Sequence, residues 1–155
     1  MQLVPIKVKK LESFSNDLSV PTYTTEEAAG ADIRCCLSPG AEMRIAPGER
    51  VLVPTGLSFE IPPGYEIQVR PRSGLSFKTG LMILNAPGTI DSDYRGEIKI
   101  IMGNLGPVTE IIKHGDRIAQ LVVAPLLQAH FIDVYSAELS STKRGEGGFG
   151  STGVC

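Results

Sequence analysis

The 155-residue sequence lacks any apolar run long enough to cross a membrane, since a membrane helix needs about 20 such residues. Residues 1–5 contain no basic segment followed by an apolar stretch, so we expect no secretory leader. A cytoplasmic protein with no membrane partner is therefore expected. The length favours one domain with a sizeable core.

An excess of basic charge is also missing. The net charge is −2 at pH 7, from 15 lysines and arginines against 17 aspartates and glutamates. Nucleic-acid-binding surfaces usually carry a strong basic excess, so we expect no nucleic-acid partner. Lys7, Lys9 and Lys10 form the one basic cluster, which we interpret as a solvated face.

Cysteine and histidine are too few for the sites they usually build. Cys35 and Cys36 are neighbours, so in a strand their side chains point to opposite faces, which makes a disulfide between them awkward. Buried or incidental thiols are expected instead. No Cys-x-x-Cys pair accompanies His114 and His130, so a zinc site is excluded, and any metal must be a hard cation bound by oxygen.

Alternation of apolar and polar residues is frequent and predicts β-strands. Ile67 and Val69 alternate with polar neighbours, as do Ile98 and Ile100. Further β-rich runs cover residues 33–37, 51–61, 81–84, 108–112, 118–124 and 131–134. Frequent prolines leave room for one short helix, at Ser73–Lys78. The pattern predicts an all-β sandwich, jelly roll or barrel.

The last stretch, residues 140–153, is rich in serine, threonine and glycine and has one aromatic residue, Phe149. Alone it cannot bury enough surface to offset the entropy lost on ordering. We expect a flexible tail, which either has no role or acts as a lid.

Two short segments combine turn chemistry with functional side chains. Ala29-Gly30-Ala31-Asp32 is either a turn entering a strand or the position of a carboxylate near a divalent metal. Pro71-Arg72-Ser73-Gly74 places an arginine and a hydroxyl where a strand gives way to a helix. Free N–H groups at a helix start suit an anion, although a simple helical turn with Ser73 as N-cap is an equal alternative.

The segment from Asn85 to Gly96 is the most informative. Turn residues on both sides leave Thr89, Ile90 and Asp91 on a short bridge that can offer backbone groups to a flat ligand. Asp91 and Asp93 share a side if the chain is extended, so one is a candidate general base and the other a turn acceptor. A purely structural hairpin is the alternative.

Two glycine-containing segments complete the set. Gly115-Asp116-Arg117-Ile118-Ala119-Gln120 is locally a tight turn before a buried strand. The stretch from Arg144 to Gly153 contains a Gly-x-Gly-x-x-Gly pattern, but too little chain follows it for a Rossmann unit or P-loop. It fits an arm that wraps phosphates and stacks Phe149 on a base.

In this order the five segments resemble the five motifs of the trimeric dUTPases, and the resemblance spans the whole chain. That family hydrolyses dUTP to dUMP and pyrophosphate with Mg²⁺, which keeps uracil out of DNA and supplies dUMP for thymidylate synthesis. The resemblance implies a jelly-roll-like β barrel with one short helix in residues 1–139. It also implies a flexible Gly-rich arm, residues 140–155, that closes the active site of a neighbouring subunit in a homotrimer with shared sites.

The resemblance further implies roles for individual residues. Asp91 is the general base, Tyr94 lies under the deoxyribose, and Asp32 contacts Mg²⁺ through water. Uracil is held by Asn85, Thr89, Ile90 and Asp91, with Lys99 as a further contact and Phe149 on the base. The triphosphate is surrounded by Arg72, Ser73, Gly74, Gln120, Arg144, Gly150, Ser151 and Thr152.

Two competing functions are compatible with the same scaffold. A dCTP deaminase shares the fold, but the third segment matches the uracil-binding version throughout. A silent nucleotide-binding module is expected to have lost Asp91, Tyr94 or the arm, and all three are present.

Overall fold

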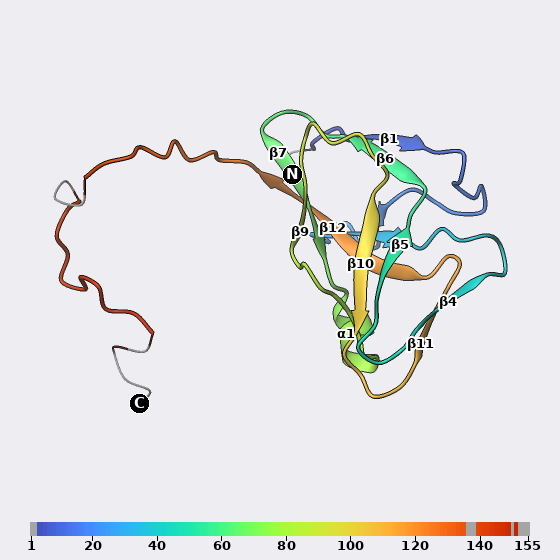
Figure 1. The fold of residues 1–155 in the computed structure, drawn as a ribbon. Helices are drawn as coiled ribbons and strands as arrows, with labels where there is room; N and C mark the ends of the chain where they lie inside the picture. The colour runs from blue at the N-terminus through green and yellow to red at the C-terminus, as the bar shows by residue number, and fades with distance from the viewer. Residues whose placement is uncertain (1–2, 136–138, 150, 152–155) are drawn as a thin grey trace.

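The computed structural model describes residues 3–135, 139–149 and 151. The described chain is built from short antiparallel strands and one helix (Figure 1). The elements are β1 Lys7–Lys10, β2 Thr22–Tyr23, β3 Ala31–Arg34, β4 Glu42–Ile45, β5 Arg50–Pro54, β6 Leu57–Glu60, β7 Tyr65–Arg70, α1 Ser73–Lys78, β8 Leu81–Ile83, β9 Gly88–Ile90, β10 Lys99–Asn104, β11 Glu110–Lys113 and β12 Arg117–Pro125. The expected all-β fold with one short helix is confirmed.

The strands form four sheets. The largest has the order β2-β3-β12-β7-β9, the next has β5-β10-β8, and β1-β6 and β11-β4 are pairs. The last strand, β12, lies between β3 and β7, so distant parts of the chain must meet before this sheet is complete. The described strands do not close into a barrel.

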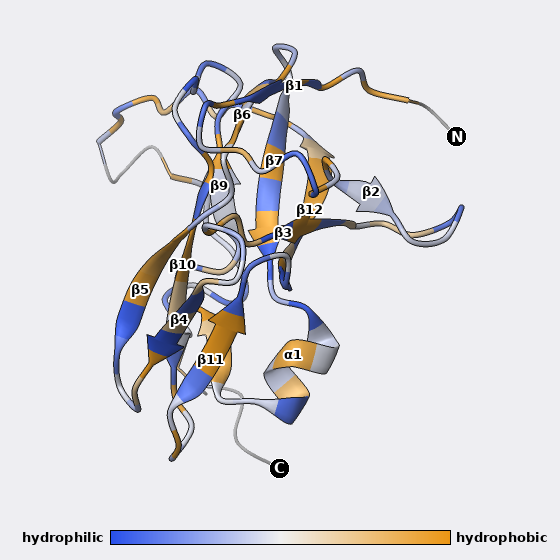
Figure 2. Ribbon diagram, turned by 90° about the vertical axis from the view of Figure 1, so that its right-hand side faces the viewer, coloured by the Kyte–Doolittle hydropathy of each residue, from blue (hydrophilic) through white to orange (hydrophobic). Residues whose placement is uncertain are grey.

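Apolar side chains fill the space between the sheets because the alternation seen in the sequence matches the pleat of the strands. Ile67 and Val69 of β7 are buried, and so are Ile100 and Met102 of β10. Figure 2 shows apolar and polar residues alternating along β7. The core is mainly aliphatic and joins all the larger sheets.

Helix α1 begins where β7 ends at a proline, as expected. Arg72 holds the N-cap position with extended backbone and no side-chain cap bond. Ser73 is therefore the first helical residue, and the alternative in which Ser73 is the N-cap is wrong. No residue of α1 is buried. In the part of the chain that the structure describes, no helix is long and apolar enough to cross a membrane.

The run at residues 51–61 is interrupted by a sharp turn between β5 and β6. Gly56 has φ 65°, and a Cβ there would lie 2.9 Å from the Cα of Phe14. Left-handed backbone and close packing both require glycine at this position. The run therefore forms two strands in different sheets.

The strand expected at residues 131–134 is absent from the described structure. After β12 the chain runs away from the sheets (Figure 1), and Phe131 and Ile132 are 91% and 70% exposed. A strand needs a ladder partner, and no described strand of this chain pairs with the segment. The prediction of a strand from the β-rich composition of residues 131–134 is therefore wrong for the described chain.

Cys35 and Cys36 are both buried and free, as expected. The thiol of Cys36 donates to the carbonyl oxygen of Ser13 and accepts from the N–H of Ser15, both at 3.3 Å. These residues hold the core together and lie outside the site described next. Cys155 lies outside the described residues.

Candidate functional site

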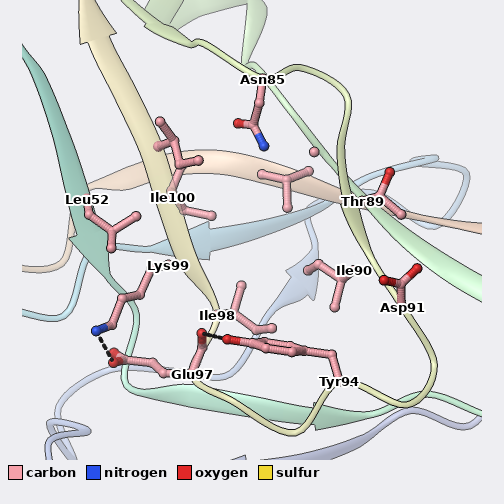
Figure 3. A pocket seen from close by; sticks show the side chains of 13 residues that line it. Leu52, Asn85, Thr89, Ile90, Asp91, Tyr94, Glu97, Ile98, Lys99 and Ile100 are labelled. Carbon is pink, nitrogen blue, oxygen red and sulfur yellow. Dashed lines mark hydrogen bonds and ion pairs between the residues drawn. The ribbon is translucent and has the colours of Figure 1, made fainter.

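A cleft of about 490 Å³ lies between β9 and the start of β10 (Figure 3). We call it the β9–β10 cleft. Its lining residues are Leu52, Val69, Asn85, Gly88, Thr89, Ile90, Asp91, Tyr94, Glu97, Ile98, Lys99, Ile100 and Ile101. The structure thus brings together the predicted residues Asn85, Thr89, Ile90, Asp91, Tyr94 and Lys99.

Strand β9 can offer its backbone to a ligand because it is the edge of the five-stranded sheet. It pairs with β7 on one side, with Thr89 opposite Gln68. On its other side, no described strand occupies the hydrogen-bonding edge. Such an edge can bind a flat donor–acceptor group as another strand would. Asn85 also lines the cleft, and its amide is directed into it (Figure 3).

Asp91 follows β9 directly and its carboxylate lies at the rim of the cleft (Figure 3). The side chain is exposed, and no described side chain hydrogen-bonds to it. Asp93, two residues later, does not line the cleft. The geometry therefore favours Asp91 over Asp93 as the reactive carboxylate.

Tyr94 forms the floor of the cleft, at the bottom of the view in Figure 3. A reverse turn, with the N–H of Tyr94 donating to the carbonyl of Asp91 at 3.2 Å, brings it there. Its hydroxyl donates to the carbonyl of Glu97 at 3.1 Å. A Cβ at Gly96 would collide with the ring, so glycine is required for this folded-back position.

Glu97 and Leu52 also line the cleft, but sequence reasoning missed both. The Glu97 carboxylate pairs with the Lys99 ammonium at 3.3 Å, so the predicted contact residue Lys99 is held by a neighbour. The two-residue spacing of Glu97 and Lys99 in the sequence could have predicted this pair, because residues i and i+2 of an extended chain share a face. Leu52 lies opposite Ile101 across β5 and β10, a register that the sequence does not reveal.

A second group of predicted residues meets around Asp32. The Asp32 carboxylate accepts from Nε of Arg72 at 2.8 Å and from Nη1 of Arg117 at 3.0 Å. Arg72 also donates to the carbonyl of Arg117 at 3.1 Å. Gln120 lies opposite Asp32 across β12 and β3, and its amide donates to the carbonyl of Pro71 at 2.7 Å. Arg117 was missed as a site residue because its segment looked like a simple turn.

This Asp32 cluster can receive an anion. Two guanidinium groups against one carboxylate leave positive charge in excess, and arginine forks suit phosphate oxygens. Ser73 and Gln120 line an open cleft of about 510 Å³ beside the start of α1. Gly74 is exposed, and a Cβ there would meet nothing within 4 Å.

The oxygen-donating side chains of the site suit magnesium only together with phosphate and water. The described residues contain no group of three or more His, Cys, Asp or Glu that could hold a metal, so a cage made by protein alone is absent from them. Magnesium is commonly bound by one or two carboxylates, phosphates and retained waters. Asp32 has accepting capacity left on its two oxygens. The residues therefore fit a magnesium ion carried by phosphate, with Asp32 as the carboxylate available to it.

Asp91 and Arg72 lie at opposite ends of β7, although the β9–β10 cleft itself extends to Val69 near the end of that strand. Ile90 is opposite Ile67, so Asp91 lies near the start of β7, whereas Arg72 follows its end. At about 3.3 Å per residue, the separation along the strand is roughly 20 Å. The structure therefore does not bring Asp91 and Arg72 together within one chain.

The predicted arm residues also lie apart from both groups. Arg144 donates to the carbonyl of Gly147 at 2.7 Å, and the N–H of Ser151 donates to the carbonyl of Gly148 at 3.0 Å. Phe149 is fully exposed. The described hydrogen bonds of residues 140–151 stay within the arm. The predicted residues Gly150 and Thr152 lie outside the described residues.

Comparison with known proteins identifies a family. The model of the dUTPase family matches residues 16–153. A deoxyuridine 5'-triphosphate nucleotidohydrolase of Bdellovibrio bacteriovorus is 56% identical over 153 residues, covering 99% of each chain. That of Desulfotalea psychrophila is 59% identical over 137 residues, covering 88% of this chain and 89% of the relative.

Solved structures show the same fold. A mutant dUTPase of Staphylococcus bacteriophage 80alpha with dUpNHpp superposes with a TM-score of 0.82 and 29% identity, over 97% of this chain and 99% of that one. A mutant dUTPase from phage phi11 of S. aureus, described with a structural Mg(II) ion, gives 0.72 and 25%, over 87% and 99%.

Proposed function

The chain belongs to the dUTPase family and hydrolyses dUTP, and we propose that Asp91 is its general base in a reaction that yields dUMP and pyrophosphate. One observation carries this proposal. The β9–β10 cleft combines a free strand edge, an inward amide, a tyrosine floor and the Asp91 carboxylate in one cavity.

Uracil selection follows from the hydrogen-bonding groups of the cleft. The edge of β9 and the Asn85 amide face the amide-like edge of uracil. Cytosine presents a different order of donors and acceptors and leaves polar groups unpaired, which such sites reject strongly. Close walls at C5 of the base exclude the methyl group of thymine.

Sugar selection is assigned to Tyr94. Its ring lies across the floor of the cleft between Asp91 and Glu97 (Figure 3). In that position it packs under the deoxyribose and leaves no room for a ribose 2′-hydroxyl.

The triphosphate is bound by the Asp32 cluster and the arm. Arg72, Ser73, Gly74 and Gln120 contribute from the start of α1 and from β12. Arg144, Gly150, Ser151 and Thr152 contribute from the arm, with Phe149 on the base. Magnesium, when bound, supplies positive charge that neutralises the phosphate oxygens, and Asp32 is the residue that would hold it, through water.

The chemical step needs one base and one positioned water. Asp91 takes a proton from the water while the water oxygen forms a bond to the α-phosphorus. The bond from the α-phosphorus to the bridging oxygen breaks, and pyrophosphate leaves with that oxygen. Base catalysis of this kind contributes roughly 10²–10⁴-fold.

The complete site is shared between chains of a homotrimer of jelly-roll-like subunits. Asp91 and Arg72 are too far apart to act on one phosphate chain within a single subunit, so one chain supplies the β9–β10 cleft and another the Asp32 cluster. The arm, residues 140–155, closes over a neighbour and excludes water other than the nucleophile. We place the protein in the cytoplasm.

Pyrophosphate release from dUTP, dTTP, dCTP and UTP tests this function. Rapid release from dUTP with much slower release from the other three is expected. Ammonia release from dCTP would identify a deaminase, and equal rates on all four nucleotides would contradict the assigned recognition.

A further inference from the structure

Four consecutive residues of the β5–β6 turn bind the segment that follows Tyr94. Thr55 donates its hydroxyl to the carbonyl of Ile98 at 2.6 Å, and Gly56 donates its N–H to Oε1 of Glu97 at 2.9 Å. The carbonyl of Leu57 accepts from the N–H of Ile98 at 2.8 Å, and Ser58 donates its hydroxyl to the carbonyl of Arg95 at 2.7 Å. We call residues 55–58 the brace.

The brace is rigid because it is buried. Thr55 and Ser58 are 1% and 4% exposed, although they are polar. Gly56 adopts its left-handed conformation against Phe14. The carbonyl of Ile98 is buried, so without the Thr55 hydroxyl it cannot regain a partner from water unless the chain rearranges. The carbonyl of Arg95 is partly buried, and the Ser58 hydroxyl is the donor that ties it to β6.

The segment held by the brace in turn holds Tyr94. Glu97 provides the carbonyl that accepts the Tyr94 hydroxyl, and Gly96 provides the surface on which the ring is folded. The ring itself is 47% exposed, so other packing fixes it only in part. The position of the Tyr94 ring therefore depends on Thr55 and Ser58, although neither residue lines the cleft.

We propose that Thr55, Ser58 and Glu97 are positioning residues that determine the selectivity for deoxyribose over ribose. The inference rests on the proposed function, in which Tyr94 excludes the 2′-hydroxyl. A small displacement of the ring opens room for one hydroxyl without removing the base contacts. Loosening the brace therefore raises activity on UTP relative to dUTP.

The test measures kcat and KM for dUTP and UTP in brace variants. Thr55→Val and Ser58→Ala each lower the ratio of kcat/KM for dUTP to that for UTP by about tenfold, because misplacement by about 1 Å has effects of this size or larger. Thr55→Ser keeps the hydroxyl and restores the ratio. Glu97→Ala lowers it, whereas Glu97→Gln keeps an acceptor for Gly56 and largely restores it.

A matched control separates positioning from general stability. Besides donating to Ile98, Thr55 accepts from the N–H of Leu57 at 3.3 Å. Thr79 makes a similar pair of bonds, donating to the carbonyl of Leu75 at 2.8 Å and accepting from the N–H of Leu81 at 3.1 Å. It does not line the β9–β10 cleft. Thr79→Val lowers the thermal midpoint yet keeps the wild-type dUTP/UTP ratio.

The outcomes distinguish the two proposals. Folded Thr55→Val and Ser58→Ala variants with wild-type ratios would overturn the role of the brace. If Thr55→Val does not fold, Ser58→Ala and the Glu97 pair decide. A wild-type protein that does not prefer dUTP over UTP would instead overturn the proposed function.

Discussion

Asp91 and Asp93 are two residues apart, yet of the two only Asp91 lines the β9–β10 cleft. Asp91→Asn keeps the size and the hydrogen-bonding reach of the side chain but removes the base. We expect kcat to fall by roughly 10²–10⁴-fold while binding of the imido analogue dUpNHpp is retained. Steady-state turnover and calorimetric titration measure the two effects.

Asp93→Asn is the matched control. It removes the same charge from the same turn without touching the cleft, so its turnover stays near that of the wild type. Comparable losses in both variants would show that local charge, and not a base at position 91, governs the rate.

Cys35 is completely buried, and this burial raises the pKa of its thiol to about 12 from 9.0, with the charges of Asp116 and Cys36 as smaller causes. Between these values the unfolded thiol loses its proton while the folded one keeps it. Folding is therefore favoured fully below pH 9 and less as the pH rises towards 12.

We expect the thermal midpoint to fall between pH 8 and pH 10.5, and to fall less steeply in Cys35→Ala. That variant is less stable at pH 8 because it leaves a cavity. Thermal unfolding of both proteins across this range isolates the thiol, since all other titrating groups are common. Parallel curves would rule out a contribution from Cys35.

At the scale of elements, helix α1 contains Gly74, a glycine that the packing of the described chain does not require. Gly74 has open space at its Cβ position, and glycine within a helix costs about 0.5–1 kcal/mol relative to alanine. The proposed phosphate contact explains the glycine, because a Cβ would limit how closely an anion approaches.

Gly74→Ala should thus raise the free energy of unfolding slightly and lower kcat/KM for dUTP. Denaturant titration and turnover measure both. Ser76→Ala on the same helix is the control and keeps wild-type activity, because Ser76 lines neither of the clefts described here. Full activity of Gly74→Ala would contradict the proposal that a phosphate approaches the backbone closely at this position.

Elements with strong alternation were predictable from sequence, and others were not. β7 forms where the alternation around Ile67 and Val69 predicted a strand, because both side chains are buried in the core. β1 and β2 escaped prediction because their residues are all exposed and carry no apolar alternation. The pairing of Arg117 with Asp32 depends on the register of β12 against β3, which includes a bulge that no local pattern encodes.

The motifs nevertheless named most of the polar residues of the β9–β10 cleft, because these follow one another along one stretch of chain. Leu52 and Val69, which the motifs missed, come from other strands. Contacts within one short segment are local in sequence, whereas cross-sheet contacts depend on packing of distant segments.

At the scale of the whole molecule, we propose that the arm acts as a separate functional unit. The hydrogen bonds of its described residues are internal, so we expect removal of residues 144–155 to leave the described strands and their hydrogen bonds intact. We expect the truncated protein to keep its thermal midpoint and assembly while kcat falls by at least about tenfold, because closure excludes water. Phe149→Ala, which touches nothing in the described chain, should show a weaker form of the same split. An unfolded or monomeric product would contradict this assignment.

The separation of Asp91 and Arg72 along β7 leads to a sharper test of the assembly. If one chain supplies the carboxylate and another the guanidinium, two inactive variants can complement each other. Asp91→Asn and Arg72→Ala are each expected to be nearly inactive alone. When they are mixed in equal amounts, unfolded and refolded together, random association gives about a quarter of the sites both intact residues. Turnover of the mixture should therefore approach about a quarter of the wild-type value. Mixing Asp91→Asn with the double variant Asp91→Asn/Arg72→Ala provides the control, because no combination then restores a carboxylate. Mixed assemblies that form, as shown by mass spectrometry, but stay inactive would mean that Asp91 and Arg72 do not serve a common site.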